Sequence, residues 1–158
     1  MTPQEFYALD PVDRVLHVFE FPSTHTPAKH QADSVNRFGE TDGHGCWDKP
    51  GTGKTFTMTL HALLSMSHGE RKQWVVLCPP AVIPNWVRWL RQIKVRSTGA
   101  PITALAYVGT PKQRAKLDLG VHFVVMSYEL FKGDYERLTE YYFSRPHSIG
   151  LICDEAHK

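Results

Sequence analysis

The sequence predicts an α/β domain with a mostly parallel sheet and helices on both faces. Short apolar runs alternate with longer segments of helical periodicity, which is the order expected of a sheet covered by helices. The apolar runs are continuous rather than alternating, which is typical of strands buried on both faces. The chain has 158 residues, enough to bury the core of one domain.

The predicted strands are five short runs without charged side chains. Segments such as Trp-Val-Val-Leu-Cys and Phe-Val-Val-Met have the length and the β-branched content of buried strands. The runs lie at Gly45–Trp47, Trp74–Cys78, Ile102–Tyr107, His122–Met126 and Ile149–Cys153.

Four helices are predicted between these runs, and a short one upstream of the first run. In one of them Val82, Trp86 and Leu90 recur at helical spacing, so we expect Trp86 in the core. Arg88 and Arg91 then lie on other faces of that helix. The predicted helices are Lys29–Arg37, Lys54–Ser67, Ala81–Ile93, Pro111–Leu117 and Tyr128–Tyr142.

Composition excludes several classes of protein. With 42% hydrophobic and 22% charged residues, the chain is neither disordered nor of low complexity. Its three cysteines are widely spaced, so we expect reduced thiols rather than a disulfide scaffold. No stretch approaches the roughly 20 apolar residues of a membrane span, and the N-terminus lacks a signal-peptide pattern. We therefore expect a reducing compartment, cytoplasmic or nucleoid/nuclear, with no secretion and no membrane partner.

Charge is distributed unevenly along the chain. Residues 51–120 contain 10 basic and 2 acidic side chains, whereas residues 1–50 contain 4 and 8, and residues 121–158 contain 4 and 6. Clustered Lys and Arg are expected of a surface that meets phosphates. A solvated helix face is the alternative explanation.

A glycine-rich segment, Asp-Lys-Pro-Gly-Thr-Gly-Lys-Thr at 48–55, opens one of the predicted helices. Gly51 and Gly53 allow backbone N–H groups to point at phosphate oxygens beside a helix N-terminus. Lys54 would reach the β- and γ-phosphates of a nucleotide, and Thr55 would place its hydroxyl on Mg²⁺. An ordinary glycine-rich turn is the alternative.

Two carboxylates directly follow the last predicted strand. Asp154 and Glu155 come at its carboxyl end, which in a parallel sheet is the edge where ligands bind. Asp154 is expected to hold Mg²⁺, and Glu155 to orient and deprotonate the water that attacks the γ-phosphate. A solvated turn is the alternative.

These segments resemble the superfamily 2 helicases and translocases, and within them the Swi/Snf-like DNA-dependent ATPases. Asp48, which replaces the first glycine of the usual phosphate loop, is similar to the Asp-Glu-Met-Gly-Leu-Gly-Lys-Thr form of that family. Gln31 resembles the family's adenine-recognising glutamine. The resemblance implies the first RecA-like lobe, with ATP and Mg²⁺ as ligands.

Three further segments carry the resemblance. Cys-Pro-Pro at 78–80, followed by Asn85-Trp86, is the most Swi/Snf-like; Tyr-Val-Gly at 107–109 and Ser-Tyr-Glu at 127–129 are similar to later family segments. The first and last of these imply a surface for nucleic acid, expected to be duplex DNA bound without sequence preference. The candidate nucleic-acid residues are Pro80, Arg88, Arg91 and Ser127.

We expect residues 1–25 to be a lead-in and residues 26–158 to form a RecA-like lobe that is incomplete at its C-terminus. In the family a second RecA-like lobe follows, so we expect the isolated chain to be nearly inactive. The alternative is a stand-alone nucleotide- or nucleic-acid-binding module without hydrolysis. The candidate nucleotide-binding residues are Gln31, Gly51, Thr52, Gly53, Lys54 and Thr55, with Lys54, Asp154 and Glu155 as catalytic residues and Thr55 and Asp154 as magnesium ligands.

Overall fold

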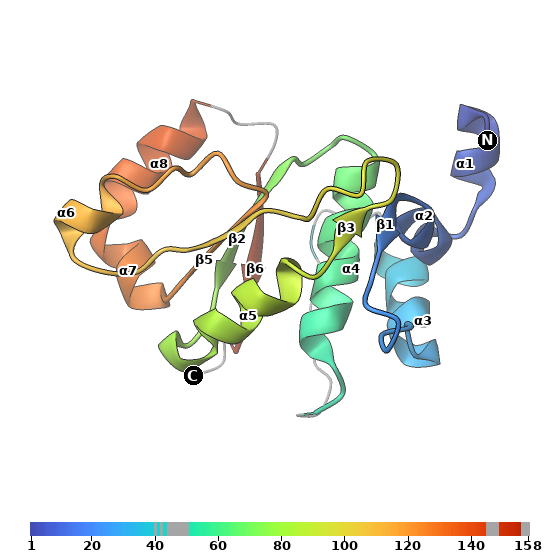
Figure 1. Ribbon diagram of the computed structural model, residues 1–158, viewed down its shortest axis with the longest axis horizontal. Coiled ribbons are helices and arrows are strands. Elements are labelled where there is room, and N and C mark those ends of the chain that lie inside the picture. The colour runs from blue at the N-terminus through green and yellow to red at the C-terminus, as the bar shows by residue number, and fades with distance from the viewer. Residues whose placement is uncertain (40, 42, 44–50, 145–148, 156–158) are drawn as a thin grey trace. The chain divides into compact units, whose positions relative to one another are not determined.

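The computed structural model describes residues 1–39, 41, 43, 51–144 and 149–155 (Figure 1). The chain divides into two compact units. Unit 1 comprises residues 1–70 and 93–101, and unit 2 comprises residues 71–92 and 102–158. Each unit has its own secondary structure and is described separately below.

Unit 1 is mainly helical. Helix α4 is at its centre, with Leu60, Leu63 and Leu64 buried, and both α2 and α3 pack against it. A short antiparallel ribbon joins β1 and β3. The elements are α1 (Pro3–Ala8), α2 (Pro11–Val18), β1 (Phe19–Glu20), α3 (Lys29–Phe38), α4 (Lys54–Ser67) and β3 (Lys94–Val95).

Unit 2 is built on a four-stranded parallel sheet. The strand order is β4-β5-β2-β6, so chain neighbours are separated in the sheet by crossover connections. This arrangement confirms the predicted α/β class and the parallel sheet. The elements are β2 (Gln73–Leu77), the 3₁₀ helix η1 (Pro80–Val82), α5 (Ile83–Leu90), β4 (Ala104–Ala106), α6 (Pro111–Arg114), β5 (Phe123–Met126), α7 (Tyr128–Gly133), α8 (Tyr135–Phe143) and β6 (Ile149–Cys153).

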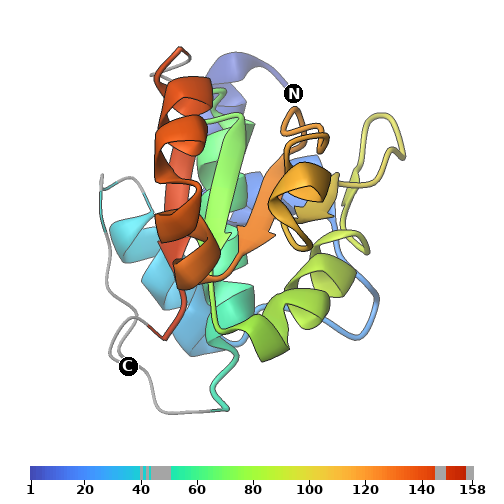
Figure 2. The same ribbon diagram turned by 90° about the vertical axis from the view of Figure 1, so that its left-hand side faces the viewer.

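Strands β2 and β5 are buried on both faces, as their continuous hydrophobic runs predict, whereas β6 is an edge strand of the described sheet, in which Ile152 is buried and Leu151 is 55% exposed. Val75 and Leu77 of β2 belong to a core cluster that includes Leu138 of α8, and Figure 2 shows α8 lying across the sheet. The alternate residue Trp74 packs over Gly150 of β6, where an added Cβ would lie 2.3 Å from the indole ring. Helix α5 packs against β4 and β5. The carboxyl ends of β2, β5 and β6 are thereby fixed side by side.

The helices differ from the sequence expectation mainly at their ends. Helix α4 has the predicted bounds, and α3 extends one residue beyond them. The predicted helix Tyr128–Tyr142 is instead two helices, α7 and α8, separated at Asp134. Gly133 is a poor helix former, and the Asp134 carboxylate is held by Arg114, so the chain leaves the helical path there. The predicted strand Gly45–Trp47 lies outside the described residues.

Helices α1 and α2 lie in the first 25 residues, where we expect only a lead-in, although the sequence carries helix-start patterns for both. Thr2 and Glu5 form a capping box at the start of α1, with Pro3 as its first residue. Asp10 followed by Pro11 marks the start of α2 in a similar way. Short helices of this kind depend on such caps because they contain few turns.

Candidate functional site

The candidate phosphate loop joins α4 through two glycines in the left-handed region. Gly51 has a φ of 83° and Gly53 a φ of 80°, a conformation that side chains with a Cβ rarely adopt. At Gly53 a Cβ would also lie 2.5 Å from Nε2 of Gln31. The backbone conformation favours glycine at position 53, and a Cβ there would also displace the Gln31 amide from the loop.

Gln31 supports this loop from helix α3. Its Nε2 donates to the carbonyl oxygens of Thr52 and Gly53, each at 3.3 Å, while its Oε1 accepts from the N–H of Ala28 at 2.9 Å. The side chain is only 6% exposed. His30 Nε2 lies 3.1 Å from the Thr52 carbonyl oxygen, a contact that no sequence motif indicates. Gln31 therefore braces the loop, and adenine recognition by Gln31 stays a prediction.

Lys54 and Thr55 occupy the first turn of α4, and both are half-buried. The helix has 14 residues and no acidic side chain in its first turn. Its N-terminus therefore has the partial positive charge that favours a phosphate group. The loop, the lysine and the hydroxyl are arranged on one short segment of unit 1.

The two carboxylates directly follow β6 in unit 2. The N–H of Asp154 donates to the Leu77 carbonyl oxygen at 2.8 Å, which extends the pairing of β6 with β2. Among the described residues, Glu155 is the only one other than glycine with a positive φ, which is 55°. A glutamate in this region carries backbone strain of the kind that is found at functional sites.

The side chain and the carbonyl of Asp154 are held by two aromatic residues. Trp86 Nε1 donates to Oδ2 of Asp154 at 2.9 Å, and the Tyr128 hydroxyl donates to the Asp154 carbonyl oxygen at 2.8 Å. Burial, followed by the nearby Cys153 and Asp154 groups, raises the pKa of Tyr128 to about 12, so its hydroxyl keeps its proton. Sequence reasoning identified Trp86 as a core residue, which its 1% exposure confirms, but missed its partner.

Cys78 adjoins the same carboxylate. Burial, and then the charge of Asp154, raises the pKa of the Cys78 thiol to about 12. This thiol is therefore a protonated core group and not a nucleophile. Both Cys78 and Cys153 are free thiols.

The donor chemistry of the candidate magnesium ligands fits that ion. The Thr55 hydroxyl and the Asp154 carboxylate are hard oxygen ligands, which Mg²⁺ prefers. Among the hydrogen bonds of the described residues, the one side-chain bond of Asp154 uses Oδ2. Thr55 belongs to unit 1 and Asp154 to unit 2, so the agreement with Mg²⁺ concerns the type of the ligand atoms and not the distance between them.

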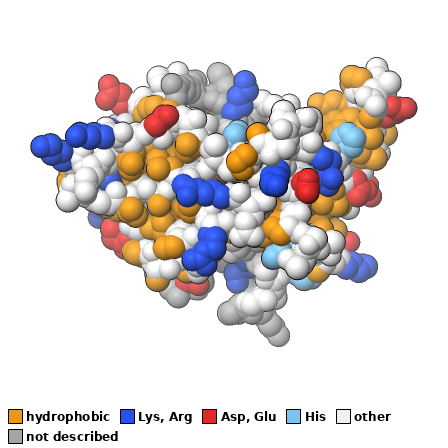
Figure 3. All heavy atoms as spheres, viewed as in Figure 1, with side chains coloured by type: hydrophobic (Ala, Val, Ile, Leu, Met, Phe, Trp, Pro, Cys, Tyr) orange, Lys and Arg blue, Asp and Glu red, His pale blue; other side chains and the backbone are white. Residues whose placement is uncertain are grey.

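The four candidate nucleic-acid residues differ in how accessible they are. Pro80 and Arg88 are exposed, at the start of η1 and on α5. Arg91 donates from Nε and Nη2 to the Ala104 carbonyl oxygen at 3.1 and 2.8 Å, so it fastens α5 to β4. Ser127 is 3% exposed and caps α7 by accepting from the Leu130 N–H. Figure 3 shows Lys and Arg side chains on this face of unit 2 as separate groups among apolar side chains.

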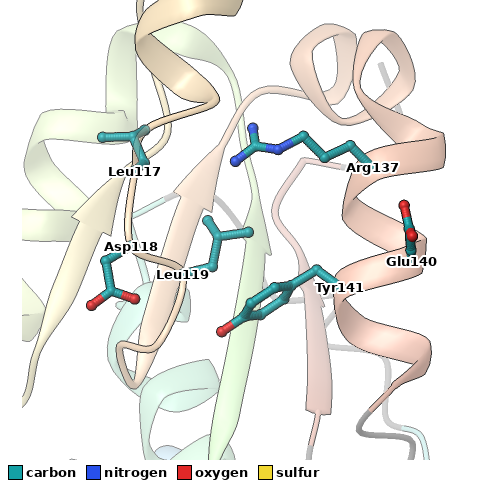
Figure 4. A pocket seen from close by; sticks show the side chains of 6 residues that line it. All are labelled: Leu117, Asp118, Leu119, Arg137, Glu140 and Tyr141. Atoms are coloured by element: carbon teal, nitrogen blue, oxygen red, sulfur yellow. The ribbon is translucent and has the colours of Figure 1, made fainter.

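Unit 2 also contains a pocket of ≈ 350 Å³, which is lined by other residues than these candidates (Figure 4). Leu119 and the Tyr141 ring face one another in it, and Arg137 reaches from α8 toward the segment after α6. None of the candidate site residues lines it. Its lining residues are Leu117, Asp118, Leu119, Arg137, Glu140 and Tyr141.

Comparison with protein families identifies one match. Residues 30–158 match the model of the SNF2-related domain. No curated protein matches the chain. Within the described residues, none of the helices has both the length and the apolar character required to span a membrane.

Proposed function

The chain belongs to the SNF2-related domain family, and on this premise we propose that residues 26–158 form the ATP-binding first RecA-like lobe of a DNA-dependent ATPase. Residues 1–25 would be its lead-in. The observation that carries the proposal is the loop itself. Two left-handed glycines, Gly51 and Gly53, lead directly into helix α4, and Gln31 on α3 donates to the carbonyl oxygens of Thr52 and Gly53.

In the proposed site each residue has a separate task. Backbone N–H groups of Gly51, Thr52 and Gly53 would bind phosphate oxygens, and Lys54 would meet the β- and γ-phosphates. Thr55 and Asp154 would hold Mg²⁺, which when bound neutralises the phosphate charge.

Glu155 is proposed as the general base. Its carboxylate would accept a proton from the attacking water, which needs a fixed position beside the γ-phosphate. The strained φ of 55° supports this role, because such strain persists only where the surrounding structure enforces it. We propose that turnover also needs a second RecA-like lobe, which in related phosphoryl-transfer enzymes supplies an arginine.

The nucleotide proposal is tested by Lys54→Ala, with Lys72→Ala as a matched control that removes an equal charge from unit 2. We expect the Lys54 variant to bind ATP–Mg²⁺ at least about tenfold more weakly, or about 1.4 kcal/mol, in calorimetric titration. The control should bind like the wild type. Equal affinity of wild type and Lys54→Ala would refute the assignment.

We further propose that unit 2 contacts duplex DNA through exposed groups of η1 and α5. Arg88 is the best candidate because Arg91 already binds a backbone carbonyl and Ser127 caps a helix. Such phosphate contacts would be weak, salt-dependent and indifferent to sequence. We propose a reducing compartment, cytoplasmic or nucleoid/nuclear, as the place of this activity.

Salt dependence tests the DNA proposal. Arg88→Ala should make the fall of log affinity with log salt less steep, by up to roughly 0.9 on duplex DNA, because one phosphate contact is lost. Lys112→Ala on α6 serves as the control and should keep the wild-type slope. If both variants match the wild type in a fluorescence titration, Arg88 faces solvent and not DNA.

A further inference from the structure

Trp86 is a buried residue whose polar atom faces the candidate magnesium ligand. Its side chain is 1% exposed, and Nε1 donates to Oδ2 of Asp154 at 2.9 Å. The two residues are 68 positions apart in the sequence, and both belong to unit 2. A buried indole N–H bonded to a carboxylate is a charge-assisted contact, which is stronger and more directional than a neutral one.

Burial of a tryptophan in this unit does not by itself explain the hydrogen bond between Trp86 and Asp154. Trp74 is also buried, and among the described residues its Nε1 has no hydrogen-bond partner. Within the described part of unit 2, one buried indole is thus without an acceptor, while the other donates to a carboxylate. The difference indicates that the orientation of Trp86 is tied to Asp154.

Asp154 is fixed from three directions by segments that follow the neighbouring strands. Leu77 at the end of β2 accepts from its N–H, and Tyr128 after β5 donates to its carbonyl oxygen. Trp86 on α5 holds its side chain. The backbone contacts place the residue, and among the described residues Trp86 is the one that donates to the carboxylate and so sets its rotation.

We propose that Trp86 is a positioning residue for Asp154. Its N–H binds Oδ2, so the orientation of the carboxylate that would hold Mg²⁺ depends on the position of α5. Because α5 also carries Arg88, a nucleic acid that shifts this helix would act on the magnesium ligand through a single hydrogen bond. This inference rests on the proposed ATP site.

The first test compares Trp86→Phe, which keeps an aromatic ring but removes the N–H, with Trp89→Phe on the same helix. ATP affinity is measured with Mg²⁺ and again with EDTA. Trp86→Phe should weaken binding by about tenfold with Mg²⁺, as loss of an outer-shell partner of a metal ligand does, and change it less than twofold in EDTA. Trp89→Phe should match the wild type in both. Thermal unfolding confirms that both variants are folded.

The outcomes separate this inference from the function on which it rests. A wild type that does not bind ATP overturns both. If the wild type binds ATP, two results overturn the positioning role alone. Trp86→Phe could bind ATP as tightly as Trp89→Phe, or its affinity could fall equally with and without Mg²⁺. Adding Trp86→Phe to Asp154→Asn should weaken Mg²⁺-dependent binding little further, because without the Asp154 carboxylate Trp86 has no magnesium ligand to orient.

A second measurement does not depend on the folding of a Trp86 variant or on nucleotide. The chain has four tryptophans, so a ¹⁵N NMR spectrum of the protein should contain four indole N–H signals. Asp154→Asn should move one of them strongly, and this should be the signal that is missing in Trp86→Phe where that variant folds. If no indole signal responds to Asp154→Asn, the hydrogen bond is absent in solution and the proposal fails.

Discussion

Two aspartates of unit 2 accept hydrogen bonds from buried side chains, but from donors of different charge. Asp134 receives Nε and Nη2 of Arg114 at 2.7 and 2.9 Å, and the Tyr107 hydroxyl at 2.6 Å. Asp154 receives the neutral indole of Trp86. The Arg114 hydrogen bond and then that of Tyr107 lower the pKa of Asp134 to about 2.

The contrast distinguishes a structural carboxylate from one suited to bind a ligand. The charge of Asp134 is already balanced by a guanidinium, and Arg137 extends the network by donating to the Tyr107 hydroxyl and the Arg114 carbonyl oxygen. A cation would have to displace Arg114 to bind there. Among the described residues the one donor to the Asp154 carboxylate is the neutral Trp86, which orients the carboxylate without balancing its charge, as suits a magnesium ligand.

The largest effect that this comparison predicts is on stability. Asp134→Asn removes the charge opposite Arg114, which is 6% exposed and would be left as a buried cation. We expect the free energy of unfolding to fall by about 2–3 kcal/mol, because the buried Arg114 cation is left without its charged partner. Chemical denaturation of the variant measures this loss.

Asp154→Asn is the matched control for that prediction. The amide oxygen can still accept from the Trp86 N–H, and no opposite charge is left behind, so stability should change by less than about 1 kcal/mol. If both variants lose the same free energy of unfolding, the charge of the hydrogen-bond donor does not explain the difference between the two aspartates.

A smaller effect is expected in acid. Because the folded pKa of Asp134 is about 2 and its ordinary value is 3.8, the stability from this group is present above pH 3.8 and is lost as the pH falls toward 2. With partial screening by solvent, its contribution should be about 1–2 kcal/mol. Unfolding curves between pH 5 and 2 should show this loss in the wild type and a shallower one in Asp134→Asn. Parallel curves would contradict the assignment.

Local patterns were sufficient to predict the strands of unit 2 and the helices α3 and α4 of unit 1, but not α1, α2, β1 or β3. Helix α4 begins at Lys54 because Gly-x-Gly-Lys-Thr contains its own turn and helix start, and the strands of unit 2 are evident as continuous apolar runs. The break between α7 and α8 was not predicted. Gly133 is tolerated within many helices, and what separates the two is the side-chain network around Asp134.

The sequence by itself determined the fold class, the family and the candidate residues of the phosphate loop and of the strand end, because these signals are carried by residues close together in the chain. Only the tertiary structure decided what those residues touch. Trp86 and Asp154 meet because α5 packs beside the sheet and β6 pairs with β2, and Gln31 meets the loop because α3 packs on α4. Hydrogen bonds of this kind depend on strand register and helix packing, which arise from the burial of the whole core and not from any local pattern.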